Sequence, residues 1–169
     1  MQYTVREKDS KEPNAALFRS LEPLLRGIGI ALIDLSVFHG NRGGVQVKTV
    51  VMAKAETAGF STDTGVEDCA RAHRLIMPRL ELAFPGKDIS LEVSSPGINR
   101  LIKDGSEFVH FIGREIRCYR TDISDWTIGI LRSVDEQKIV LLEEGGETIL
   151  SYETIAKARL NAAIKNTGG

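Results

Sequence analysis

The chain lacks any long apolar run. No stretch approaches the roughly 20 apolar residues that a membrane-crossing helix requires. The first residues, Met1 to Asn14, are polar and mixed in charge, so they lack the apolar centre of a secretory signal peptide. These absences argue against a helical membrane protein and predict a cytoplasmic one.

Cysteine is scarce as well. The sequence holds 2 cysteines, Cys69 and Cys118, which lie far apart and on predicted elements of different type. Disulfides are typical of exported proteins, and no export signal is present. We therefore predict two reduced, half-buried thiols.

The chain also has no excess of one charge. Its 22 lysine and arginine residues are balanced by 23 acidic residues, which gives a formal net charge of −1. A protein that binds naked nucleic acid by itself usually has a strong basic excess, because phosphate neutralisation supplies most of the affinity. A near-neutral chain is better suited to a protein partner, or to a ribonucleoprotein that it contacts partly through protein.

What the sequence does contain is a change of pattern between its two halves. The first half alternates helical and strand periodicity, which predicts a domain of residues 13–94 with αββαβ order, a three-stranded sheet and two helices on one face. Residues 1–12 are predicted to be a loose tail. The predicted elements are a helix at about 13–26, strands at 30–37 and 45–53, a helix that starts at the capping box Thr64-Gly65-Val66-Glu67, and a strand at 89–93.

The second half contains short strands separated by tight turns. This pattern predicts a small all-β domain, an SH3-like barrel at residues 101–163, with a second loose tail at 164–169. The fold class is therefore α+β. Gly129 lies within a predicted strand and would allow a sharp bend. The predicted strands are 115–120, 127–134, 138–143, 147–151 and 156–160, with a 3₁₀ turn at Tyr152-Glu153-Thr154 before the last.

A search for catalytic chemistry finds one pair of interest. Cys69 and His73 are four residues apart and would share a helix face, so they form either a nucleophile with its base, half of a metal site, or part of the apolar stripe. Since no second pair of ligands lies near them, the stripe is the favoured interpretation. Phosphate-binding and nucleophile-elbow patterns are absent. We predict no enzyme activity, no cofactor and no metal.

Arginines supply the candidate binding residues. Arg71, Arg74 and Arg79 define the polar face of the second helix, and a solvated surface is their favoured interpretation. In the strand-rich half, Arg117 and Arg120 lie near Trp126. An aromatic ring beside arginines is typical of a platform for a peptide or a base. Trp126 could equally plug the rim of the small barrel, and both interpretations stay open.

The segment from Leu91 to Arg100 joins the two halves. Pro96 and Gly97 suit the central positions of a type II turn, because proline fixes φ and glycine accepts positive φ. The flanking Ser94 and Ser95 can satisfy nearby backbone groups. We predict a stiff interdomain joint at 95–100, with Glu92 and Arg100 as a possible pair across it. The alternative is an ordinary tight turn within one domain.

The run Glu92-Val93-Ser94-Ser95-Pro96-Gly97, followed by Arg100, closely resembles the hallmark of the ribosome maturation factor RimP family. The family pattern continues with aspartate, arginine and proline, whereas this chain has Asn99, Arg100 and Leu101. Further likeness lies in Leu21-Glu22-Pro23 before Gly29 to Asp34, in Glu67-Asp68-Cys69 and in Ile155 to Leu160. The likeness covers nearly the whole chain in the same order.

This resemblance implies an N-terminal α/β domain followed by an SH3-like barrel. It also implies a monomeric factor that binds the free small ribosomal subunit late in assembly, with ribosomal RNA contact and the twelfth small-subunit ribosomal protein as a direct partner. Ribosomal proteins are strongly basic, so a near-neutral chain with acidic turns is complementary to that partner. The alternative is a generic RNA-binding barrel protein of the SH3-like or Sm-like kind.

Overall fold

The computed structural model describes residues 1–3, 13–53, 65–97 and 99–161. The chain divides into two compact units, with the boundary between Pro96 and Gly97. Residues 1–3 belong to the C-terminal unit and not to the N-terminal one. No helix in the described ranges is long and apolar enough to span a membrane. The two units are described separately below.

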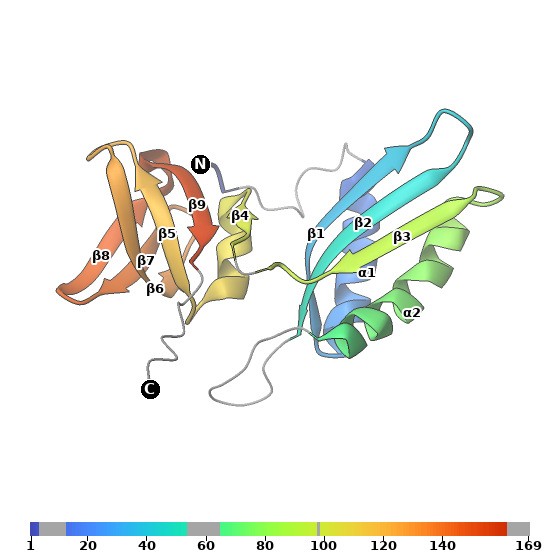
Figure 1. The fold of residues 1–169 in the computed structure, drawn as a ribbon, viewed down its shortest axis with the longest axis horizontal. Helices are drawn as coiled ribbons and strands as arrows, with labels where there is room; N and C mark the ends of the chain where they lie inside the picture. The colour runs from blue at the N-terminus through green and yellow to red at the C-terminus, as the bar shows by residue number, and fades with distance from the viewer. Residues whose placement is uncertain (4–12, 54–64, 98, 162–169) are drawn as a thin grey trace, which may run out of the picture. The chain divides into compact units, whose positions relative to one another are not determined.

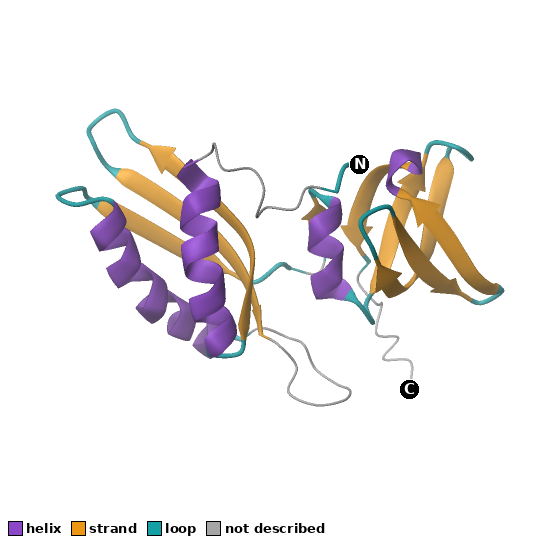
Figure 2. Ribbon diagram, turned by 180° about the vertical axis from the view of Figure 1, so that it is seen from behind, coloured by secondary structure: helices purple, strands orange, loops and turns teal. Residues whose placement is uncertain are grey.

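The N-terminal unit is a three-stranded sheet with both helices on one face (Figures 1 and 2). This confirms the predicted αββαβ order. Strands β1 and β2 form an antiparallel hairpin, and β3 pairs with β2 in parallel. The elements are α1 (Pro13–Gly27), β1 (Ile30–His39), β2 (Val45–Ala53), α2 (Val66–Ala83) and β3 (Ile89–Ser94).

A β-bulge changes which side chains of strand β1 lie on the same face of the sheet. Simple alternation would place Leu35 and Val37 on the face opposite Ile30 and Leu32. The register with β2 shifts between Leu32 and Asp34, and such an extra residue reverses the alternation beyond it. Leu35 and Val37 therefore pack with Ile30 and Leu32 in one core beneath the helices.

The start of helix α2 also differs from its prediction. The N-cap is Gly65, and the Asp68 carboxylate accepts a hydrogen bond from the Gly65 N–H at 3.0 Å. The sequence assigned that role to Glu67, which instead pairs with Arg74 at 3.1 Å. The predicted cap residue Thr64 lies outside the described residues. A shift of one residue is within the usual uncertainty of helix ends.

The C-terminal unit contains a six-stranded sheet in the order β4-β9-β5-β6-β7-β8 (Figure 1). The two-residue strand β4 was not predicted. Within the described part of the chain, the outermost strands β4 and β8 are not paired with each other. The elements are β4 (Leu101–Ile102), η1 (Gly105–Phe111), β5 (Glu115–Arg120), β6 (Asp125–Val134), β7 (Lys138–Glu143), β8 (Gly146–Ser151), η2 (Tyr152–Thr154) and β9 (Ile155–Leu160).

The core of this unit lies on one face of the sheet, where the 3₁₀ helix η1 contributes Phe108 and Phe111, both fully buried. Gly129 faces the same side. A Cβ there would lie 2.8 Å from the Leu142 carbonyl oxygen and 3.1 Å from the Leu141 Cβ. The glycine is therefore needed for the close approach of β6 and β7, which the sequence did not indicate.

Candidate partner-binding face of the C-terminal sheet

Arg117, Tyr119 and Trp126 form a cluster on the outer face of the C-terminal sheet. Because β5 pairs antiparallel with β6, Tyr119 lies directly opposite Trp126 and Arg117 lies opposite Ile128. The Arg117 guanidinium carbon is 5.2 Å from the centre of the Trp126 ring. The Tyr119 and Trp126 rings meet edge to face, with 5.5 Å between centres. The structure thus brings together two of the three predicted binding residues.

Arg117 also holds the end of the interdomain segment. Its Nη2 donates to Asn99 Oδ1 at 3.2 Å, and Nη1 of Arg159 donates to the Asn99 carbonyl at 3.2 Å. Arg117 and Arg159 lie opposite each other on β5 and β9. The Arg117 side chain therefore touches both the Trp126 ring and Asn99 of the joint.

Arg120, the third predicted binding residue, is engaged elsewhere. Its Nε and Nη2 donate to the Asp122 carboxylate at 3.1 and 2.6 Å. These bonds raise the pKa of Arg120 and lower the pKa of Asp122. Arg120 thus stabilises the turn between β5 and β6, and a partner would have to displace Asp122 to reach its guanidinium.

An exposed apolar strip continues from Trp126 across three strands. Ile130 lies opposite Leu142, and Val140 lies opposite Ile149, so the apolar side chains of β6, β7 and β8 are neighbours. The members of this outer strip and their exposed fractions are Trp126 at 38%, Ile128 at 47%, Ile130 at 38%, Leu142 at 39% and Ile149 at 62%.

The apolar residues at alternate positions of strand β6 could have indicated this strip from the sequence, but the sequence analysis did not use them. From Trp126 to Leu131, the inward positions hold Thr127, Gly129 and Leu131, while the outward positions hold Trp126, Ile128 and Ile130. A strand with one solvated face normally carries polar residues there. Contiguous apolar side chains on an exposed face are typical of an interaction site.

The borders of the outer strip carry opposite charges. On the β9 side lie Arg159, opposite Arg117, and Lys157, opposite Tyr119. On the β7–β8 side, Glu147 lies opposite Leu142 and pairs with Arg132 at 2.9 Å, and the turn contains Glu143 and Glu144. A partner that covers the strip therefore meets a basic border on one side and an acidic border on the other.

The structure shows the backbone conformation and the side-chain contacts of the predicted joint. Gly97 has φ +75°, the value expected at the third position of a type II turn. Arg100, which the sequence paired with Glu92, forms its ion pair with Glu107 at 3.0 Å. On the other side, the Ser94 hydroxyl donates to the Thr49 carbonyl at 3.5 Å. Ser95 is exposed.

Cys69 and His73 do not form a site. His73 is exposed, which corrects its predicted place in the apolar stripe. Cys69 is half-buried against the N-terminal core, and burial together with the nearby Asp68 raises the pKa of its thiol. In the described ranges, no three His, Cys, Asp or Glu side chains are grouped to hold a metal ion.

The arginines of helix α2 serve mainly local contacts. Arg71 Nη2 donates to the Ile28 carbonyl at 2.9 Å, which ties α2 to the end of α1. Arg74 pairs with Glu67 on the exposed surface, and Arg79 is exposed. This arrangement agrees with a solvated helix face and leaves the outer strip as the stronger candidate.

Comparison with known proteins shows which proteins the chain is similar to. No family model matches it. The protein named ribosome maturation factor RimP of Borrelia hermsii is 27% identical over 148 residues, which cover 88% of this chain and 96% of the relative. The protein of the same name from Microcystis aeruginosa is 29% identical over 150 residues, covering 85% and 90%. The matches span both units and agree with the residue pattern around Pro96, so along most of its length the chain is similar to ribosome maturation factors of the RimP family.

Proposed function

We propose that this protein acts in late assembly of the small ribosomal subunit by binding alone, without catalysis. It binds the free immature subunit in the cytoplasm as a monomer, and its direct partner is the basic twelfth small-subunit ribosomal protein. The names of its relatives support a role in ribosome maturation. The proposal goes beyond these names in specifying the partner and the stage of assembly.

The observation that carries the proposal is the outer strip. A soluble chain gains nothing by exposing Trp126, Ile128 and Ile149 together unless a partner covers them. Interfaces are built around such apolar centres with charged borders, and tryptophan and arginine are enriched among the residues that dominate binding energy. We further propose that the six-stranded sheet curls into the SH3-like barrel expected from the sequence, with the strip on its outside.

Charge favours a basic protein as the occupant. The acidic border at Glu143, Glu144 and Glu147 adjoins the most exposed member of the strip, Ile149. A lysine- or arginine-rich partner would pair with this border while an apolar patch covers the strip. Complementary charges of this kind speed association and fix orientation.

The test replaces strip residues with glutamate in the full chain. An isoleucine buried at an interface contributes about 2 kcal/mol, so Ile128→Glu and Ile149→Glu should each weaken binding by about tenfold or more. Leu82→Glu is the matched control, because Leu82 is 76% exposed on helix α2, far along the chain from the strip. The readouts are sedimentation of cell extract on a density gradient and binding to the purified ribosomal protein.

Wild-type protein and Leu82→Glu should sediment with free small subunits, and the strip variants should stay at the top of the gradient. Wild-type protein that travels only with mature ribosomes, or with none, contradicts the role in assembly. Strip variants that bind the subunit as well as Leu82→Glu does contradict this face as the interface.

RNA is the second candidate partner, because Arg117 is stacked on Trp126 next to Arg159 and Lys157. Binding through phosphates would fall steeply with salt. Arg117→Gln with Lys157→Gln would then weaken binding to isolated small-subunit RNA and reduce its salt dependence. Binding to the ribosomal protein would change much less.

A further inference from the structure

Strand β8 lies at the border of the C-terminal sheet with one edge open (Figure 1). It pairs with β7 in a continuous register from Gly146 to Ser151, and no described strand pairs with its other edge. Proteins usually protect such an edge with a proline, a bulge or an exposed charge. β8 has no proline and no bulge, and its one charged residue, Glu147, is paired with Arg132. The edge is therefore suited to pairing with a further strand.

The register with β7 shows which main-chain groups of β8 face outward. Hydrogen-bonded and non-hydrogen-bonded residue pairs alternate along an antiparallel ladder. Directly after β8, the Tyr152 N–H donates to the Gln137 carbonyl at 3.1 Å. Counting back by twos from Tyr152, the residues bonded to β7 are Leu150 and Thr148. The residues whose main-chain groups point away from β7 are Glu147, Ile149 and Ser151. Within the described ranges, the N–H groups of these three make no hydrogen bond.

The open edge adjoins the outer strip. Ile149 belongs to the strip and is also one of the outward-facing edge residues. Side chains two residues apart on a strand lie on the same face of the sheet, so a strand added beside β8 would lay every second side chain over the face that carries the strip. One partner can therefore cover the strip and pair with the edge.

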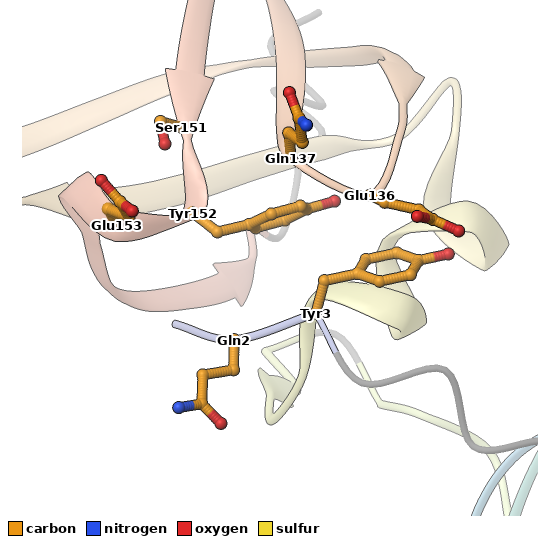
Figure 3. Close-up of a pocket in the computed structure, with 7 residues that line it drawn as sticks. All are labelled: Gln2, Tyr3, Glu136, Gln137, Ser151, Tyr152 and Glu153. Carbon is orange, nitrogen blue, oxygen red and sulfur yellow. The ribbon is translucent and has the colours of Figure 1, made fainter. Parts of the chain in front are cut away.

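An acid-lined hollow lies at the end of this edge, where β8 runs into η2 (Figure 3). Ser151 lines it, together with the carboxylates of Glu136 and Glu153 and the rings of Tyr3 and Tyr152. Gln2 and Gln137 complete the lining, which contains no basic side chain. Carboxylates attract a cation, and aromatic rings stabilise one that lies over them. A lysine or arginine side chain is the group that this hollow fits.

The first residues of the chain hold one wall of the hollow in place. The nitrogen of Met1 donates to the carbonyl oxygens of Tyr152 and Ile155, at 3.0 and 2.7 Å. The ring centre of Tyr3 is 5.7 Å from that of Tyr152. The prediction of a loose tail at residues 1–12 is therefore wrong for the first three residues, and the remainder lies outside the described ranges.

We propose that an extended segment of a basic protein partner adds to the open edge of β8 as a further strand, and that a lysine or arginine of this segment enters the acid-lined hollow. The basic partner is taken from the proposed function, on which this arrangement rests. In strand addition, main-chain hydrogen bonds supply affinity and side-chain pockets supply specificity.

Charge selects the occupant of the edge. Glu143 and Glu144 lie in the turn at the start of β8, and Glu136 and Glu153 line the hollow at its end. A lysine- or arginine-rich segment is complementary to both ends. A second copy of this chain would bring its own acidic turn and hollow to the same edge, and like-charge repulsion disfavours that pairing.

Ser151→Pro tests the added strand without breaking the sheet. Ser151 has φ −71°, close to the value of about −65° at which proline is fixed, and its N–H points away from β7. Ser151→Pro thus removes one outward donor, whereas the control Ser151→Ala keeps it. The probe is the purified basic ribosomal protein of the proposed function, added to the full chain. Ser151→Pro should bind it about fivefold more weakly or worse, and both variants should keep the thermal stability of wild type.

Hydrogen exchange locates the bound segment and does not depend on any variant. In the free wild-type protein, the amides of Glu147, Ile149 and Ser151 should exchange much faster than those of Thr148 and Leu150, which bond to β7. In the complex, the three outward amides should slow at least tenfold. Glu136→Gln with Glu153→Gln should weaken binding several-fold and reduce its salt dependence, because the hollow loses both carboxylates.

The outcomes separate this arrangement from the proposed function. Binding without new protection of the outward amides, or equal binding by Ser151→Pro and Ser151→Ala, overturns strand addition and leaves the proposed partner standing. Unchanged binding after both glutamates of the hollow are replaced overturns its role as the cation site. Wild-type protein that does not bind the probe contradicts the proposed partner and, with it, this occupant of the edge.

Discussion

Arg100 and Glu107 form an ion pair in the interior of the C-terminal unit. Nη2 of Arg100 lies 3.0 Å from Glu107 Oε2, and Nε donates to the same carboxylate at 3.1 Å. The Arg100 side chain is 9% exposed and that of Glu107 is 1% exposed. Arg100, the last residue of the joint, is thereby fixed to helix η1 of the C-terminal unit.

Removing Arg100 should destabilise the C-terminal unit strongly. Arg100→Ala leaves the Glu107 carboxylate buried without this cation, and loss of one partner of a buried pair costs about 3–5 kcal/mol. Unfolding in urea can be followed by the fluorescence of Trp126, the one tryptophan of the chain. Arg132→Ala is the control, since its pair with Glu147 is exposed and should contribute less than about 1 kcal/mol. Equal losses in both variants would contradict the prediction.

Gly129→Ala should also destabilise the C-terminal unit, by about 1–3 kcal/mol, because the added methyl group collides with the backbone of β7. Gly145→Ala is the matched control. A Cβ at Gly145 meets nothing within 4 Å, and its φ is not positive. Thermal unfolding of both variants should show a clear drop for Gly129→Ala alone. A drop of the same size for Gly145→Ala would mean that the crowding at β7 is not the cause.

The two cysteines should differ in reactivity. Burial raises the pKa of the Cys118 thiol to about 12, so at pH 8 only about one molecule in ten thousand carries the reactive thiolate. Cys69 is half-buried and should react slowly with a thiol reagent. Cys118 should react only after urea is added. Labelling followed by peptide mass spectrometry distinguishes the two sites, and rapid labelling of Cys118 in the native protein would refute its burial.

The same thiol predicts a loss of stability at alkaline pH. The unfolded chain ionises Cys118 near its ordinary pKa of 9.0, whereas the folded state keeps it protonated up to about 12. The free energy of unfolding should therefore fall as pH rises from about 9 towards 12, by at most about 1.4 kcal/mol per pH unit from this group. Urea titrations at several pH values should show a weaker decline in Cys118→Ala.

Pro96→Gly should loosen the joint while leaving both units folded. Glycine removes the fixed φ that precedes Gly97, whose φ is +75°, so the segment gains backbone freedom. Binding to small subunits should weaken several-fold, with little change in thermal unfolding. Pro85→Gly, in the exposed turn after α2, is the control for the chemical change alone. A large drop in thermal stability, or unchanged binding, would contradict a role for Pro96 in orienting the units.

Several features of the fold could be read from local patterns. Apolar spacing located both helices of the N-terminal unit, and the tight turns between short strands located β5 and β7 to the residue. The positive φ of Gly97, +75°, followed from the Pro96-Gly97 pair, which suits a type II turn. The motif around Pro96 predicted the RimP family. These features depend on neighbours in the sequence, so the sequence determined them.

Other features required the tertiary structure. The partner of Arg100, the bulge between Leu32 and Asp34, and the stacking of Arg117 on Trp126 depend on strand register and on how helix η1 packs, which no sequence pattern specifies. The attachment of Met1–Tyr3 to Tyr152 spans nearly the whole chain and leaves no periodic signal in three residues. The sequence by itself determined which elements form and which family the chain resembles. The tertiary structure decided which side chains meet, because that depends on pairing between distant segments.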